Sequence, residues 1–133
     1  MRFTSGVRKL VLLLHIVSSL GWMGAVACFI VLDVTTVASS DVATLRAAYI
    51  GMQLMTAWVI VPLAFAALAT GIAIGLGTSW GLFRHYWVAI SLVLTVVATL
   101  VLLIQTPLIV HRADMARDPG STDAEIRGMG NLL

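Results

Sequence analysis

The sequence predicts an all-α fold, a polytopic membrane helical bundle with three transmembrane helices in a single membrane domain over residues 1–133. Composition gives the first reason, because 60% of the residues are hydrophobic and only 11% are charged, against about 25% charged residues in a typical soluble domain. Three long runs without Asp, Glu, Lys or Arg give the second, since about 20 consecutive apolar residues suffice for a helix to cross a bilayer.

The first charge-free run, residues 10–32, follows several basic residues and contains an Ala25-Val26-Ala27 triplet, as secretory signal peptides do. The apolar region of a signal peptide is only about 7–15 residues long, and this run is longer. We therefore expect an uncleaved transmembrane helix. The other two runs, residues 49–76 and 86–110, also exceed the length of a span, and neither has the polar stripe of a buried soluble helix.

Polar segments separate and follow the three runs. In segment 33–48, Ser40 or Asp41 is placed to N-cap a helix that begins at Val42 and continues into the second span. Segment 77–85 is predicted to be a turn with a tryptophan at the membrane surface. The tail, residues 111–133, is polar and has a chain-breaking stretch from Asp118 to Thr122.

Residues in the first run, and in and just before the third run, carry a family resemblance. They are His15 followed by Trp22-Met23-Gly24, then His85-Tyr86-Trp87-Val88, then the segment 92–99. With these features, the chain resembles over most of its length a family of small actinobacterial integral membrane proteins of unknown function. The resemblance implies a four-helix bundle whose fourth helix follows a segment like residues 128–133, and that helix is absent from this sequence.

The first run alone has a weaker resemblance to two further families. Copper-resistance membrane proteins of the D type and membrane-bound protoporphyrinogen oxidases both carry a histidine and then a Trp-small-Gly element on their first helix, as His15 and Trp22-Met23-Gly24 do here. The oxidases also have a lysine on their third helix. The corresponding segment here, residues 88–91, has no lysine, so that activity is not expected.

The distribution of positive charge predicts the orientation. The basic residues divide equally between the two sides of the membrane, but Arg2, Arg8 and Lys9 directly precede the first span, whose flanks usually dominate, and no basic residue closely follows it. The positive-inside rule therefore predicts a cytoplasmic N-terminus. Together with the family resemblance, this indicates the inner (cytoplasmic) membrane of a bacterium.

Two histidines are the candidate cofactor-binding residues. His15 lies about 8 Å into the first span, and His85 immediately precedes the third, so both approach the same side of the membrane. Two facing imidazoles would provide axial ligands for a haem b iron. The alternative is that a neutral His15 bonds a serine or a carbonyl while His85 lies among the lipid headgroups.

Copper handling is a second alternative. Soft sulfur and imidazole ligands select Cu(I), and several such residues lie toward the other side of the membrane. Methionine is also a common apolar filler, and no short motif concentrates these residues. The single cysteine excludes an internal disulfide and a Cys-rich zinc site. The residues concerned are Met23, Cys28, Met52, Met55 and His111.

Small and amide residues predict helix packing. Gly71 and Gly75 lie four residues apart, a spacing that lets helix backbones approach closely, and Gly21 and Gly24 begin similar pairs in the first run. Two amides at matched depth, Gln53 and Gln105, are predicted to contact each other across the second and third spans. Pro62 lacks an amide hydrogen and is expected to kink the second span.

These observations favour a structural or accessory membrane protein that acts through helix–helix contacts, as a homo-oligomer or with partner membrane helices. Haem binding and copper handling remain as alternative hypotheses. The spans contain no nucleophile–base pair or carboxylate pair, so an enzyme is not favoured. A net charge of +2 from scattered residues does not form a nucleic-acid surface.

Overall fold

The computed structural model describes residues 4–77 and 86–129, and within them every regular element is helical. Three helices are long and apolar enough to cross a membrane, over Ser5–Ala38, Val42–Leu76 and Ala89–Arg117. The predicted all-α class with three membrane-spanning helices is therefore confirmed. The elements are α1 (Ser5–Ala38), α2 (Val42–Met55), a π-helical turn (Thr56–Ile60), α3 (Val61–Gly77), α4 (Tyr86–Arg117) and α5 (Asp123–Gly128).

The predicted N-cap of the second span is confirmed at Asp41. Its carboxylate Oδ2 accepts the Thr44 amide hydrogen at 2.9 Å and the Thr44 hydroxyl at 2.6 Å. Amide groups of the first helical turn lack partners within the helix, and an aspartate side chain supplies one of them. The chain therefore turns between α1 and α2 and re-enters a helix at Val42.

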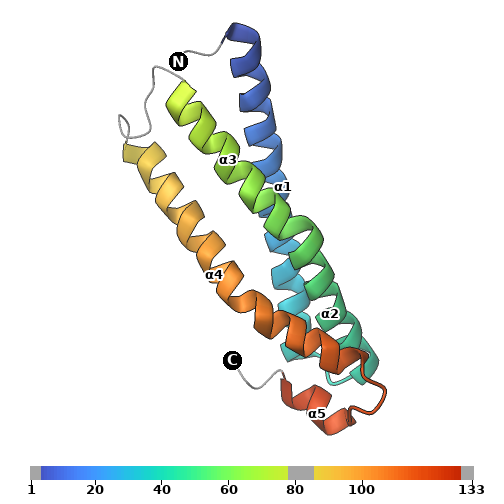
Figure 1. Cartoon of the computed structure of the whole chain (residues 1–133). Coiled ribbons are helices and arrows are strands. Elements are labelled where there is room, and N and C mark those ends of the chain that lie inside the picture. Colours follow the sequence, from blue (N-terminus) through green and yellow to red (C-terminus); the bar gives the residue numbers. More distant parts are fainter. Residues whose placement is uncertain (1–3, 78–85, 130–133) are drawn as a thin grey trace.

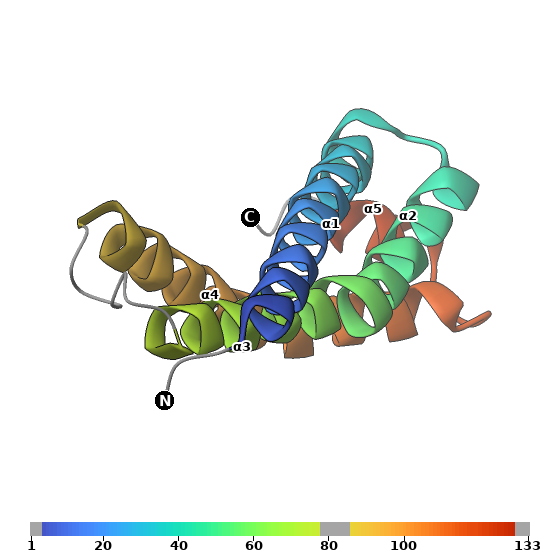
Figure 2. The same cartoon turned by 90° about the horizontal axis from the view of Figure 1, so that it is seen from above.

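The long segment formed by α2, the π-helical turn and α3 occupies the centre of the molecule. α1 packs most extensively on α3 and then on α2, while α4 packs chiefly on α2. Figure 1 shows α3 between α1 and α4 at the end of the molecule that contains the N-terminus. At the other end, α4 packs on α2, and α5 packs on α2 as well. Seen from above, α5 projects between α1 and α2 (Figure 2).

The outer helices pack along lines of buried and half-buried residues that recur in alternating steps of three and four. This spacing keeps one side of a helix against its neighbour and is typical of left-handed coiled packing. The line on α1 comprises Val11, His15, Ser18, Trp22, Ala25, Phe29, Leu32 and Thr36. The line on α4 comprises Leu92, Thr95, Thr99, Leu102, Thr106, Ile109, Ala113 and Ala116.

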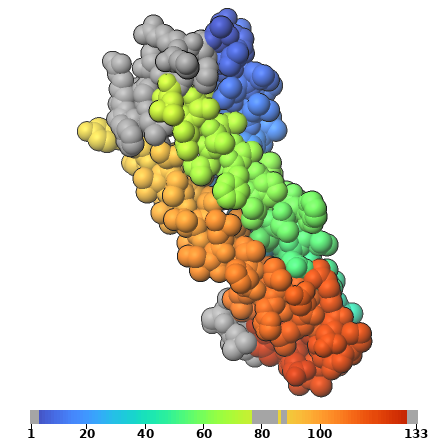
Figure 3. All heavy atoms as spheres, in the orientation of Figure 1, coloured from blue at the N-terminus to red at the C-terminus, as the bar shows by residue number. Residues whose placement is uncertain are grey.

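The opposite faces of these helices are apolar and exposed. Leu20 on α1 is 64% exposed and Ile104 on α4 is 77% exposed. Figure 3 shows α4 lying along the length of the molecule with its side chains uncovered. Such surfaces are expected where lipid, rather than water, solvates the helix.

The expected irregularity at Pro62 takes the form of a π-helical turn. The Val61 amide donates to the Thr56 carbonyl, five residues back, instead of to the Ala57 carbonyl. Pro62 has no amide hydrogen, and a regular α-helix would crowd its ring against the Trp58 carbonyl. The wider turn over Thr56–Ile60 carries the chain past the proline without ending the helix.

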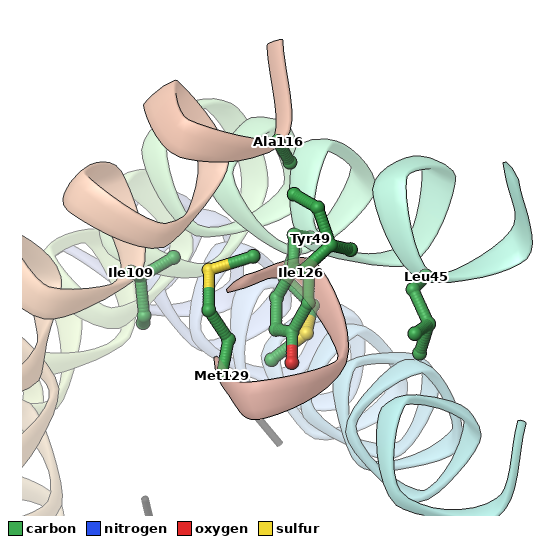
Figure 4. Close-up of a cluster of buried hydrophobic side chains, with 7 residues drawn as sticks. Leu45, Tyr49, Ile109, Ala116, Ile126 and Met129 are labelled. Atoms are coloured by element: carbon green, nitrogen blue, oxygen red, sulfur yellow. The ribbon is translucent and has the colours of Figure 1, made fainter. Parts of the chain in front are cut away.

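The α5 end of the molecule contains its hydrophobic core cluster. Buried residues of α2, α4 and α5 meet there, and Phe29 and Leu32 of α1 pack against them. Figure 4 shows Ile126 and Met129 directed toward Tyr49 and Ile109. The seven buried members are Leu45, Tyr49, Met52, Ile109, Ala116, Ile126 and Met129.

Candidate functional site

His15 joins α1 to α3 by its imidazole ring. The ring is half-buried, and its Nδ1 atom lies 3.1 Å from the Ala67 carbonyl oxygen and 3.1 Å from the Thr70 hydroxyl oxygen. The contact therefore ties the line of packing residues on α1 to a turn of α3. The sequence left open whether His15 bonds a serine or a carbonyl, and in the structure its partners are a carbonyl and a threonine.

The partners of Nδ1 determine where the ring proton lies. A carbonyl oxygen only accepts hydrogen bonds, so Nδ1 must carry the hydrogen. The Thr70 hydroxyl donates to the Ala66 carbonyl at 2.6 Å, which leaves its lone pairs free to accept from His15. In a neutral ring, Nε2 then has an unshared lone pair, and no residue that the structure describes forms a hydrogen bond to it.

Gly71 makes the approach of His15 possible. A Cβ atom added at Gly71 would lie 3.1 Å from His15 Cε1 and 3.5 Å from Nδ1. Even the smallest side chain at this position would push the ring back by a few tenths of an ångström. Gly75, one turn further along α3, is buried and Gly71 is half-buried, so the two glycines lie on the packed side of the helix.

Ser18 and Trp22, the polar neighbours of His15 on α1, form no hydrogen bond to its ring. Ser18 donates to the Leu14 carbonyl at 2.8 Å and also lies 3.1 Å from the His15 carbonyl, so its hydroxyl is satisfied within its own helix. Trp22 Nε1 is buried and has no hydrogen-bond partner among the described residues. The second histidine of the predicted haem site, His85, lies outside the described residues.

The predicted copper ligands do not gather in one place. Cys28 and His111 are exposed, and Met23 is 62% exposed. Met52 is instead buried in the core cluster, and Met55 is not a member of that cluster. Over residues 4–77 and 86–129, no group of three or more His, Cys, Asp or Glu residues is arranged to hold a metal ion.

The two predicted packing glycines of α1 have different surroundings. A Cβ atom at Gly21 would meet the end of the Leu63 side chain at 3.2 Å, so Gly21 lies at the contact with α3. A Cβ atom at Gly24 would have no described atom within 4 Å. Gly24 therefore faces away from the other helices that the structure describes.

The predicted amide contact has only one member inside the fold. Gln53 Oε1 is buried and has no hydrogen-bond partner in the described part of the chain. Gln105 is exposed on α4. No hydrogen bond between the two amides is formed, because the Gln105 side chain lies on the outer surface rather than against α2.

Arg46 has a position that the sequence did not indicate. Its guanidinium donates to the carbonyl oxygens of Ala116 at 2.8 Å, Asp118 at 3.0 Å and Ser121 at 3.0 Å. These carbonyls lie at the end of α4 and in the turn into α5, where carbonyl oxygens have no amide partner within a helix. The three residues lie 70 to 75 positions from Arg46 in the sequence, so no local signal could have identified them.

Two carboxylates outside the membrane spans hold helix starts at this end of the molecule. Hydrogen bonds from the Thr44 hydroxyl and amide lower the pKa of Asp41 below its ordinary value. Hydrogen bonds from the Thr122 amide and hydroxyl lower the pKa of Glu125 in the same way. The reciprocal bonds between Thr122 and Glu125 form a capping box that starts α5.

Comparison with known proteins adds no family assignment. No protein-family model, curated protein or solved structure matches this chain.

Proposed function

We propose that this chain is an accessory membrane protein that acts through lateral helix contacts, with a second copy of itself as the partner. The observation that carries the proposal is the position of Gln105. Its amide is exposed on α4 within a charge-free run, beside exposed apolar residues such as Val101 and Leu108. A carboxamide in hydrocarbon without partners is unfavourable, and helices satisfy such groups by hydrogen bonding to each other.

A second copy is the partner that fits this chemistry. A glutamine side chain carries both a donor group and an acceptor group, so two Gln105 amides satisfy each other across a two-fold axis. The open side of Gly24 supports the same proposal on α1, because a helix packed there would approach the backbone closely. We also infer a bacterial inner membrane and a cytoplasmic N-terminus, supported by the basic residues that precede α1.

The test measures self-association of Gln105 variants in detergent or lipid by energy transfer between labelled chains. Gln105→Leu should weaken association roughly 3- to 30-fold, the equivalent of about 0.6–2 kcal/mol for an amide contact between membrane helices. Gln105→Asn keeps the amide and should retain most of it. Ile104→Leu, at a neighbouring exposed position, is the matched control. A monomeric parent, or a Gln105→Leu variant that associates like the parent, would contradict the proposal.

Haem binding through His15 is the second candidate function. The observation that favours it is the hydrogen bond from Nδ1 to the Ala67 carbonyl. Metal-binding histidines commonly donate one ring N–H to a carbonyl, which orients the ring and leaves the other nitrogen free for the metal. His15 Nε2 has this free lone pair, and an imidazole is a ligand of haem iron in many proteins. The bound haem would supply redox or gas-binding chemistry.

Titration with haemin tests the second candidate. Binding through His15 Nε2 should produce a saturable Soret band that His15→Ala abolishes and His111→Ala leaves unchanged. His111 is the control because it is exposed at the opposite end of the spans. If the band persists in His15→Ala, or the parent takes up no haemin, the role of His15 is limited to joining α1 and α3.

A further inference from the structure

Two methionines, Met52 and Met129, belong to the core cluster, and a third, Met115, packs against it. Met52 of α2 is 4% exposed and Met129, at the end of α5, is 3% exposed. Met115 of α4 is half-buried and packs against the same cluster. Sequence positions as distant as 52 and 129 are thus brought together by the docking of α5 on α2. The other two methionines of the described residues, Met23 and Met55, are outside the cluster.

The side chains in this cluster offer one kind of metal ligand. Thioether sulfur is soft and uncharged, and soft ligands select Cu(I) over Zn(II) and over the hard cations. The cluster contains no carboxylate, imidazole or thiolate. A divalent ion would bring two uncompensated charges into an apolar environment, so a site built from neutral sulfur favours a monovalent ion.

Tyr49 provides a second observation that points to an occupant. It is 2% exposed, and its hydroxyl is buried without a hydrogen-bond partner among the described residues. Figure 4 shows its side chain beside Ile126 and Met129. An unpartnered phenol oxygen has lone pairs available to a cation, and the face of the ring attracts positive charge.

We infer that Met52, Met115 and Met129 form a thioether site for a soft monovalent ion, Cu(I), beside the Tyr49 hydroxyl and ring. Methionine side chains rotate about three bonds, so the positions of their sulfurs can adapt to an ion. Because the three ligands come from α2, α4 and α5, a bound ion would hold α5 on the end of the bundle. The site is distinct from the surroundings of His15. His15 lies in the first half of α1, whereas the cluster packs against Phe29 and Leu32 in the second half.

The test is a titration of the full chain in detergent with Ag(I), a soft monovalent ion that is stable in air, followed by Cu(I) without oxygen. Isotope-labelled methionine methyl groups report on each sulfur by nuclear magnetic resonance. The signals of Met52, Met115 and Met129 should shift together and saturate at one ion per chain. The signals of Met23 and Met55 should stay in place, which makes them internal controls.

Substitution to leucine separates metal binding from packing, because leucine replaces methionine in a core at nearly constant volume. Met52→Leu and Met129→Leu should each abolish saturable binding and keep the dispersed methyl spectrum of the folded chain. Met23→Leu should bind like the parent. Absence of shifts in the parent would overturn the inference and leave the cluster as packing alone. Equal shifts of Met23, or unimpaired binding by Met52→Leu, would overturn it in favour of non-specific thioether binding.

Discussion

Replacement of Gly71 by alanine should stabilise the chain less, or destabilise it, when the His15 ring is present than when the ring is absent. The added Cβ atom would lie 3.1 Å from His15 Cε1, closer than ordinary carbon contacts, so the ring must retreat by a few tenths of an ångström. Retreat lengthens the two 3.1 Å contacts of Nδ1 with Ala67 and Thr70 beyond the usual hydrogen-bond range.

Two effects of known size compete in this substitution. Alanine favours the helix over glycine by about 0.8–1.0 kcal/mol. Hydrogen bonds between membrane helices contribute about 0.6 kcal/mol on average and up to about 1.7 kcal/mol. Gly71→Ala should therefore change the free energy of unfolding by between about 0.4 kcal/mol of stabilisation and about 0.9 kcal/mol of destabilisation. In a His15→Ala background only the helix effect remains, and the same substitution should stabilise by about 0.8–1.0 kcal/mol.

A double-mutant cycle in mixed micelles, with reversible unfolding followed by circular dichroism, gives the coupling directly. We expect about 0.6–1.7 kcal/mol between His15 and Gly71. Gly21→Ala is the matched control, because its added Cβ atom meets only the flexible end of Leu63, at 3.2 Å. Gly21 should therefore show no coupling to His15. A coupling of His15 to Gly71 as small as that to Gly21 would refute the assignment of Gly71 as the position that admits the ring.

Three further predictions concern the α5 end of the molecule. Arg46→Ala should weaken the docking of α5 by about 2 kcal/mol, because three carbonyls lose a charged donor. Amide hydrogen exchange in α5 should then be faster than in the parent, and the control Arg8→Ala should show no such change. Tyr49→Phe removes a buried hydroxyl without a partner and should leave thermal stability unchanged or raised, so a clear loss would show that the hydroxyl has a partner after all. Because the pKa values of Asp41 and Glu125 are lowered in the folded chain, the two ionised carboxylates contribute stability at pH values above their ordinary pKa values of 3.8 and 4.5. This contribution is lost as the pH falls through the pKa values of the folded state. Acid should therefore speed amide hydrogen exchange at the starts of α2 and α5. Asp41→Asn should remove the pH dependence of exchange at the start of α2.

The features predicted from sequence depend on neighbours along the chain. Charge-free runs predict helices because lipid leaves the backbone no other way to satisfy its hydrogen bonds. The N-cap at Asp41 is a contact with a residue three positions away. α5 also had a local signal, the Thr122-x-x-Glu125 capping box. It was missed because a helix of 6 residues depends on docking, here through Ile126 and Met129.

The features that were not predicted depend on which side of a helix faces its neighbour. Gly21 and Gly24 each begin a pair of small residues, but only Gly21 faces α3. The expected pairing of Gln53 with Gln105 was wrong, since Gln105 lies on the outer surface of α4. Partners such as the carbonyls bound by Arg46 are determined by the path of the whole chain, so residue spacing cannot predict them.

The π-helical turn before Pro62 makes the packing of the central segment sensitive to the number of residues it contains. One residue advances an α-helix by about 100° around its axis, and a π-helical turn holds nearly one residue more than an α-helical turn. The turn therefore keeps the buried sides of α2 and α3 in phase, with Met52, Thr56, Ile60 and Ala64 all turned inward. A residue inserted or deleted between Ile60 and Gly71 would rotate the surface that receives His15 away from α1. A residue added between α1 and α2 would only lengthen a loop.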